Sequence, residues 1–527
     1  MCKLCDEGRP QNHARTQLGR RDFLKISAAG AAAMGLFSPP ARAAVSDDPP
    51  APGQRYVIRG GHVMSMDPKV GDFVNADVLV EGKKILAVGP AISAGAAAVI
   101  DATGKIVMPG FVDTHHHQFE TAIRSFLADG LLFNDGDPSG HGAINYFQYI
   151  LGTFAPVYRP QDVYINELFG SLAQLDAGVT TSHDISQIHY SKDHSVAAIE
   201  GSAASGRRIV FGFFEGARAD LLGSPPGAWY PEGARELKKT YFSSSDQLMT
   251  MSMGGEIYLQ PQPDVYERAW RLGRQLGIPV VAHIVGSFGM APEFEAIATG
   301  KRKVRFGSDN LFIHMTGMTD RAWAEVKAVG AGVSLAVPIE MNMRHGTPPI
   351  IKTLQMGIQP SLSVDVEVTL TADMFTQMRS TMTLQRMFEN ARALGESYAA
   401  GFPKLPLLTS RDVLRYATLQ GAKDLKLDGK VGSLTPGKDA DIILLDAEAI
   451  NVHPLNHVPG AVVSLMERSN VDTVIVAGKV RKWRGKLLDV DLATLRTRLE
   501  QSRDDLFEAA RVRQDLFRPD RAETAEL

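Results

Sequence analysis

The chain has 527 residues, a formal net charge of -3 and an apolar content of 44%. This length exceeds the usual size of one domain, so it predicts one large domain with an accessory one. The near-neutral charge excludes the basic field of a nucleic-acid-binding protein, and no apolar run reaches the roughly 18 residues of a stable membrane span.

Residues 1–43 have the three parts of an export leader in the expected order. Residues 20–25 read RRDFLK, a short Ala/Gly-rich run follows over 26–37, and Ala41-Arg42-Ala43 has the small-x-small pattern of a cleavage site. The segment resembles a twin-arginine signal peptide. That resemblance implies the twin-arginine export machinery as a partner, cleavage near Ala43/Ala44, and a periplasmic or secreted mature protein. The only cysteines, Cys2 and Cys5, lie within the leader, so the mature chain is expected to use no thiolate.

Short β-rich segments separated by turns lie near both ends of the mature chain. Behind a linker at 44–54 they cover 56–58, 77–81, 84–88 and 99–101, and near the other end they cover 440–446, 471–476 and 479–482. Two such blocks around a long central segment predict one small, split β-sandwich, with halves at 55–109 and 426–485.

The central segment, 110–425, alternates apolar β-branched runs with helical patterns. This rhythm is typical of a parallel sheet with helices outside it. The predicted strands are 111–117, 180–184, 209–215, 248–253, 280–285, 311–315, 332–337 and 361–366. Eight strands are the number that closes a (β/α)₈ TIM barrel, so the fold class is predicted as α/β with a barrel and the split sandwich.

Polar residues fall at or near the carboxyl ends of these strands, which is where a TIM barrel builds its active site. They are His115, His117, Asp184, Glu215, His283, His314 and Asp365. Alternate residues of a strand face the same side, so His115 and His117 are expected to point together and His116 away. The imidazoles of His115, His117 and His283 with the carboxylate of Asp365 would suit a single divalent metal, Zn²⁺ first and Fe²⁺ second.

Four longer stretches extend this pattern: IVMPGFVDTHHH, LDAGVTT, GKVGSLTPGKDADIILLD and VDTVIVAGKV. With them the chain resembles the amidohydrolase superfamily, in its cytosine deaminase/triazine hydrolase-like branch, from Val57 to Lys482. The resemblance implies that His115, His117, His283 and Asp365 bind the metal. It implies that His314 polarises the substrate while Asp365 also acts as general base. The fourth strand lacks the lysine that bridges two metals in binuclear relatives, which favours one metal.

One departure from the family bears on the reaction. Family deaminases have a glutamate three residues after the histidine of the fifth strand, and Gly286 occupies that position here. Glu293 and Glu295 lie too far along the chain to be taken as equivalents. Asp184 and Glu215 are alternative acids, although each is equally consistent with a structural bond to backbone at the barrel rim.

Three functions therefore remain open for a small-molecule substrate. The first is hydrolysis of an amide, carbamate or other C–N bond by metal-activated water. The second is deamination of a heterocyclic or aromatic amine with a displaced proton shuttle, and the third is a metal-binding barrel without catalysis. Loops at 128–149 and 338–349 are predicted to form a lid. The tail, 486–527, is predicted to be helical over 492–516 and to pack on the barrel or on another subunit of a homo-oligomer.

Overall fold

The computed structural model describes residues 48–134, 136, 142–217, 227–257, 261–395 and 406–517. The predicted leader at 1–43, its cleavage site and both cysteines lie outside these ranges, as does the end of the tail. Within them, no helix combines the length and the apolar character that a membrane span requires.

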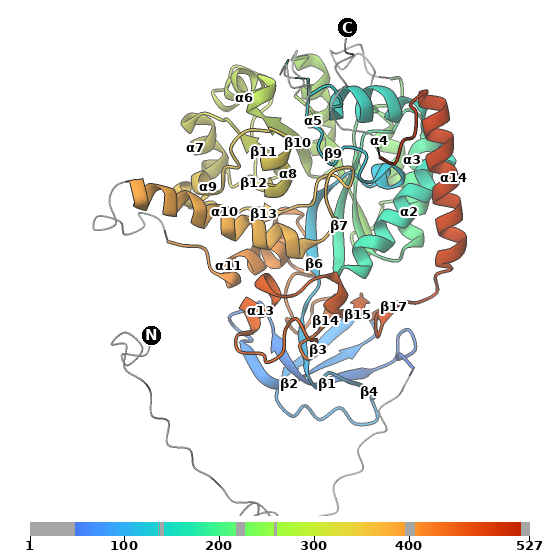
Figure 1. Cartoon of the computed structure of the whole chain (residues 1–527), viewed down its shortest axis with the longest axis vertical. Coiled ribbons are helices and arrows are strands. Elements are labelled where there is room, and N and C mark those ends of the chain that lie inside the picture. The colour runs from blue at the N-terminus through green and yellow to red at the C-terminus, as the bar shows by residue number, and fades with distance from the viewer. Residues whose placement is uncertain are drawn as a thin grey trace, which may run out of the picture. The chain divides into compact units, whose positions relative to one another are not determined.

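Eight parallel strands form one sheet in the order β13-β12-β11-β10-β9-β8-β7-β6, so neighbours in space are also neighbours in the chain (Figure 1). They are β6 (Phe111–His116), β7 (Val179–Ser186), β8 (Arg208–Phe213), β9 (Met249–Gly254), β10 (Val280–Val285), β11 (Asn310–Thr316), β12 (Gly332–Leu335) and β13 (Ser361–Leu362). All eight predicted strands are present. The predicted α/β class with a TIM barrel is confirmed.

The barrel closes between its first and last strands through residues at the predicted metal site. The Asp365 amide donates to the His115 carbonyl at 2.9 Å, and the His117 amide donates to the Asp365 carbonyl at 2.9 Å. This seam explains why the last strand is shorter than the predicted 361–366. Asp365 has a φ of 71°, which is outside the extended conformation of a strand, so regular pairing stops before it.

Two other predicted strand ends were wrong. The segment 209–215 ends at Phe213, where its pairing with Ser186 of β7 stops, so Glu215 lies beyond the strand. The segment 332–337 ends at Leu335, because helix α8 (Val337–Asn342) begins directly afterwards with a proline in its first turn.

Helices follow most of the barrel strands and lie outside the sheet (Figure 1). Besides α8, they are α2 (Pro160–Asp176), α3 (Lys192–Ala204), α4 (Gly233–Thr240), α5 (Pro263–Gln275), α6 (Ala291–Ala298), α7 (Asp320–Val329), α9 (Ile350–Met356), α10 (Met374–Gly395), α11 (Ser410–Arg415) and α12 (Gly421–Asp424). Shorter helical turns cover Gln118–Ile123, Tyr146–Phe154, Ala155–Val157, Gly286–Phe288, Tyr416–Gln420 and Arg468–Asn470.

A second, nine-stranded mixed sheet combines strands from both ends of the described chain, as the split β-rich blocks predicted. Its members are β1 (Tyr56–Met64), β2 (Asp72–Glu81), β3 (Lys84–Gly89), β4 (Ala98–Asp101), β5 (Lys105–Pro109), β14 (Ile442–Asp446), β15 (Val471–Val476), β16 (Lys479–Trp483) and β17 (Lys486–Leu487). β5 pairs with β14 and joins the two halves. The sequence prediction did not include β5 or β17. Helix α13 (Val458–Ser464) lies between β14 and β15 in the chain.

The predicted tail helix is α14 (Leu492–Ala510), which runs beside α2 of the same chain (Figure 1). The predicted end at 516 was wrong, because Arg511 has a φ of 55° and ends the helix. Arg159 at the start of α2 pairs with Asp505 at 2.6 Å, and the Ser502 hydroxyl donates to Asp162 at 2.9 Å. Of the two expected packing surfaces, α14 thus uses the barrel of its own chain. Homo-oligomer formation remains a prediction.

A buried ion cluster joins the barrel to the nine-stranded sheet. Arg208, at the start of β8, lies 3.0 Å from Asp441 and 2.9 Å from Asp439, and these three side chains are 2%, 1% and 5% exposed. Both carboxylates precede β14. The guanidinium therefore compensates two charges that burial would otherwise make costly.

Replacing Arg208 by Ala is expected to lower the free energy of unfolding by about 3–5 kcal/mol, because it leaves buried Asp441 without its cation and Asp439 with Lys84 alone. Urea denaturation followed by tryptophan fluorescence would measure the change. Arg503→Ala, which removes a half-exposed guanidinium paired with its exposed neighbour Asp504, is the matched control and is expected to shift stability by less than about 0.5 kcal/mol. Equal effects of the two variants would contradict this account.

Candidate metal centre

Strand β6 brings two imidazoles to the carboxyl end of the barrel. His115 and His117 point to the same side, with their Nε2 atoms 2.9 Å apart. His116 points elsewhere, with its ring 3.9 Å from the carboxylate of Glu367. The predicted alternation of these three side chains is therefore present.

Two further residues reach the same point from distant strands. The Nε2 atom of His283, on β10, lies 3.0 Å from that of His115. The Oδ1 atom of Asp365, which follows β13, lies 3.4 Å from Nε2 of His115 and 3.5 Å from Nε2 of His117. The structure thus brings all four predicted ligands into one buried cluster.

The protonation pattern of this cluster fits a cation. Burial, together with the neighbouring imidazoles, holds the pKa of His115 and His117 well below the usual value, so both are neutral. Nδ1 of His117 lies 2.6 Å from the Ile185 carbonyl and Nδ1 of His283 lies 2.7 Å from the Glu256 carboxylate. At His283 the Glu256 carboxylate outweighs burial and raises the pKa of the ring. Because the Ile185 carbonyl requires an N–H donor, Nε2 of His117 carries a lone pair that faces the His115 ring. A cation bound in the cluster would accept such a lone pair.

The carboxylate is held in a strained backbone conformation. Asp365 has a φ of 71° and His314 a φ of 69°, values that cost energy in residues other than glycine. Burial raises the pKa of Asp365 to about 7. Strain at two neighbouring positions of one cavity is typical of residues that are fixed for function.

His314, the predicted catalytic histidine, lies on the other side of Asp365. Its Nε2 atom is 3.6 Å from Oδ2 of Asp365, and its Nδ1 atom is 3.1 Å from the Glu340 carboxyl. Glu340 also accepts the Ala336 amide at 2.9 Å, so it holds the ring of His314 against the start of α8.

Asp113 organises the backbone beneath the cluster. Its Oδ1 atom accepts the amides of His115 at 3.2 Å and Val364 at 3.1 Å, and its Oδ2 atom accepts from Gln174 at 2.6 Å. One carboxylate therefore fixes the backbone of the predicted ligand His115 and that of Val364, the neighbour of Asp365.

The structure gives a physical reason for glycine at position 286. A Cβ atom there would lie 2.5 Å from the Thr316 carbonyl oxygen and 2.7 Å from the Cα of Gly317, which are both backbone atoms. A glutamate at 286 would therefore require the end of β11 to move. The more distant Glu293 is engaged by Arg302 at 2.6 Å and by the Tyr266 hydroxyl, so it does not substitute.

Of the two alternative acids, Asp184 is held by hydrogen bonds from its own surroundings. It accepts the Gln118 amide at 3.3 Å and the Ser186 hydroxyl at 2.9 Å, although burial raises its pKa to about 6. Glu215 lies beyond the end of β8 and is 5% exposed.

The predicted site residues did not include four polar side chains around the cluster, Glu120, Tyr146, Glu256 and His345, although Tyr146 and His345 lie in the segments predicted to form a lid. The Tyr146 hydroxyl donates to Glu120 at 2.6 Å, while the other carboxyl oxygen of Glu120 has no hydrogen-bond partner among the described residues. Each of the four lies in a loop or a short helical turn, where no periodic pattern marks it. The run Gln118-Phe119-Glu120 directly after the histidines was the one available signal.

Glu256→Gln is expected to weaken metal affinity by about 10- to 100-fold, because it removes the charged acceptor that orients His283. Titration of the metal against a chromophoric chelator would measure the change. Glu267→Gln, which alters a buried carboxylate on α5 bonded to Arg271, is the control and should leave affinity unchanged. Unaltered affinity in the Glu256 variant would show that this contact does not support the site.

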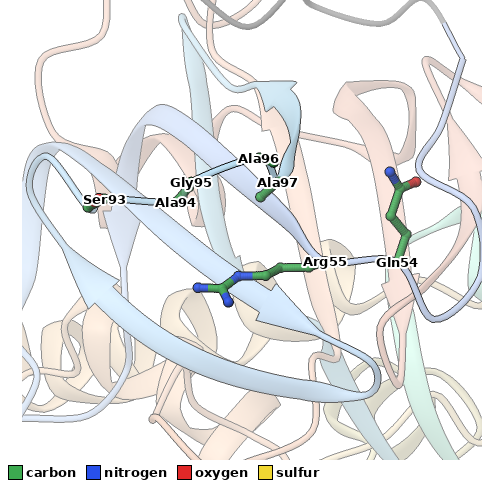
Figure 2. A pocket seen from close by; sticks show the side chains of 7 residues that line it. All are labelled: Gln54, Arg55, Ser93, Ala94, Gly95, Ala96 and Ala97. Carbon is green, nitrogen blue, oxygen red and sulfur yellow. The ribbon is translucent and has the colours of Figure 1, made fainter.

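A separate shallow concavity of about 530 Å³ lies on the nine-stranded sheet (Figure 2). It is lined by Gln54, Arg55 and residues 93–97, and Arg55 supplies its only ionisable side chain. It offers neither an imidazole nor a carboxylate.

Comparison with known proteins identifies the class to which this barrel and site belong. The amidohydrolase family matches residues 106–481, and a twin-arginine translocation pathway signal sequence matches residues 17–37. The chain belongs to the amidohydrolase family and is a hydrolase that acts on carbon–nitrogen bonds. Its leader is an export signal.

Two relatives that cover most of this chain are deaminases. The chain is 26% identical over 456 residues to a 5'-deoxyadenosine deaminase of Methanosarcina mazei, covering 82% of this chain and 94% of the relative. It is 25% identical to a 5-methylthioadenosine/S-adenosylhomocysteine deaminase of Pelotomaculum thermopropionicum, covering 82% and 95%.

Two zinc-containing structures share the fold. An adenosine deaminase from Xanthomonas campestris has a TM-score of 0.71 at 22% identity, covering 87% of this chain and all of that one. A mutant atrazine chlorohydrolase from Arthrobacter aurescens has a TM-score of 0.72 at 17% identity, covering 85% and 100%.

Proposed function

We propose that this chain holds one divalent metal through His115, His117, His283 and Asp365 and hydrolyses an amide, carbamate or related C–N bond of a small molecule. The observation that carries the proposal is the position of Nε2 of His115, which lies 2.9 Å from Nε2 of His117, 3.0 Å from Nε2 of His283 and 3.4 Å from Oδ1 of Asp365. This donor set suits Zn²⁺ first and Fe²⁺ second. A metal bound there would lower the pKa of water and polarise the scissile group.

The chain's own residues have defined parts in this reaction. Asp365 accepts the proton of the attacking water, and His314 stabilises the oxyanion that develops on the substrate. The 3.6 Å separation of their side chains is compatible with both acting on one substrate. Strand β9 has no lysine in Met249–Gly254, which supports one metal in place of two.

Deamination of a heterocyclic or aromatic amine is the second candidate. The names of the two curated relatives support it, since both are nucleoside-type deaminases. Gly286 is the reason for placing deamination second. Family deaminases have a glutamate at this position, whereas this chain has glycine and leaves no room for a side chain there.

One experiment separates the candidates. Metal content would be measured on the mature chain, followed by an activity screen over amides, carbamates, lactams and heterocyclic amines, with Asp365→Asn as the inactive control. Release of an organic amine and an acid supports hydrolysis, and release of ammonia from a ring supports deamination. A metal-loaded chain that turns over nothing would favour the third candidate, a binding barrel without catalysis.

We also propose that the mature protein begins near Ala44 and works in the periplasm or outside the cell, with domains divided at 55–109, 110–425, 426–485 and 486–527. Replacing both Arg20 and Arg21 by Lys is expected to abolish export, because the export machinery reads the arginine pair. Cell fractionation would measure this, and Arg15→Lys is the control. Unchanged export of the double variant would disprove use of this pathway.

A further inference from the structure

An additional imidazole stands beside His314 in the wall of the site. His345, in the loop between α8 and α9, is 4% exposed, and its ring centroid lies 4.6 Å from that of His314. Its Nδ1 atom has no hydrogen-bond partner among the described residues. Since buried polar atoms are nearly always partnered in folded proteins, this nitrogen is open to a partner that enters the site, either water or substrate.

The backbone of His345 is fixed against the segment that contains Gly286. The Thr316 hydroxyl donates to the His345 carbonyl at 2.7 Å, and the Ser287 hydroxyl donates to the same atom at 3.1 Å. The Gly286 amide in turn donates to the Thr316 hydroxyl at 3.4 Å. These contacts hold His345 beside the position from which a side chain at 286 is sterically excluded.

We propose that His345 transfers the proton to the leaving nitrogen. In family deaminases a glutamate at the position of Gly286 is the proton shuttle, and here that position has no side chain. This inference rests on the proposed hydrolysis of a C–N bond. The orphan Nδ1 atom, its closeness to His314 and the closed space at Gly286 carry it. Burial lowers the pKa of His345 to about 3, so the resting ring is neutral and one of its two nitrogens carries a lone pair.

The proton transfers balance for an amide substrate. Asp365 takes the first proton of the attacking water as the C–O bond forms. Nδ1 of His345 takes the remaining hydroxyl proton of the tetrahedral adduct and delivers it to the nitrogen as the C–N bond breaks. The products are a carboxylate and a neutral amine, His345 regains its starting form, and Asp365 releases its proton to solvent.

A pair of probes that differ only in the leaving atom tests this role. 4-Nitroacetanilide must have its nitrogen protonated to leave, whereas 4-nitrophenyl acetate releases a stable anion that needs no proton. His345→Gln is expected to lower kcat/KM for the anilide by at least about 100-fold and to change that for the ester by less than about threefold. The background of the ester is subtracted with Asp365→Asn, and metal content is measured on every variant.

Ser287→Ala is the structural control. It removes one of the two hydroxyls bonded to the His345 backbone and leaves the imidazole in place, so it should affect both probes equally and slightly. Equal losses on both probes in His345→Gln, or no loss on the anilide, would overturn the proposal. If the wild-type chain carries metal and hydrolyses neither probe nor any amide of the screen, the proposed function itself fails and this inference falls with it.

Discussion

Asp365→Asn is expected to lower kcat/KM on any substrate of the screen by at least about 10³-fold, because it removes both the proton acceptor and an anionic ligand. Asn keeps nearly the same shape, so the packing of the buried cluster changes little. The backbone bonds that close the barrel at this residue use main-chain atoms and remain available. Steady-state kinetics on purified, metal-loaded protein would give the ratio.

Asp320→Asn is the matched control for this prediction. Asp320 starts α7, and its side chain is 90% exposed and pairs with Lys352. The control should retain activity within about twofold, since exposed pairs contribute little. An Asp365 variant that kept a tenth of the wild-type rate would exclude the carboxylate as general base.

His115→Asn is expected to remove the metal and with it the response of the protein to a chelator. Nε2 of His115 lies at the centre of the cluster, 2.9 Å from His117, 3.0 Å from His283 and 3.4 Å from Asp365. Losing this donor leaves the site with too few ligands for tight binding. In the wild type, metal at a thousandfold excess over Kd would add about 4 kcal/mol to stability, which a chelator removes.

Thermal unfolding with and without chelator would measure both proteins, beside metal analysis. The wild type should lose thermal stability in chelator and regain it with Zn²⁺, whereas His115→Asn should show one midpoint under all conditions. His194→Asn is the control, because His194 lies in the first turn of α3, where its ring contacts Ser191 and the Tyr158 carbonyl and not the cluster, and it should respond as the wild type does. A chelator response that persisted in His115→Asn would place the metal elsewhere.

The sequence predicted what depends on periodic patterns. The alternation of His115, His116 and His117 follows from the geometry of any strand, and the positions of His283 and Asp365 follow from the common edge of a parallel barrel. For the same reason the eight strands could be counted from their apolar runs.

It could not predict contacts that are made by irregular segments. Glu256 lies two residues beyond β9 and His345 lies ten residues beyond β12, and nothing in these spacings tells which way the chain turns. The steric reason for Gly286 was also hidden, because it depends on the backbone of Thr316 in the neighbouring strand. The positive φ of Asp365 shortened the last strand for a similar reason, since its conformation is set by the seam and not by local propensity.

That seam joins residues that are very distant in the chain. Beside it, the Val364 amide donates to Asp113, which is 251 positions away, and the last strand itself is only two residues long. A metal bound across His115 and Asp365 would cross-link the unfolded chain over a loop of this length, much as a disulfide does, and long loops gain most from such closure. The amide protons of His117 and Asp365 should therefore exchange with deuterium slowly in the metal-bound protein and be among the first to become labile when the metal is withdrawn.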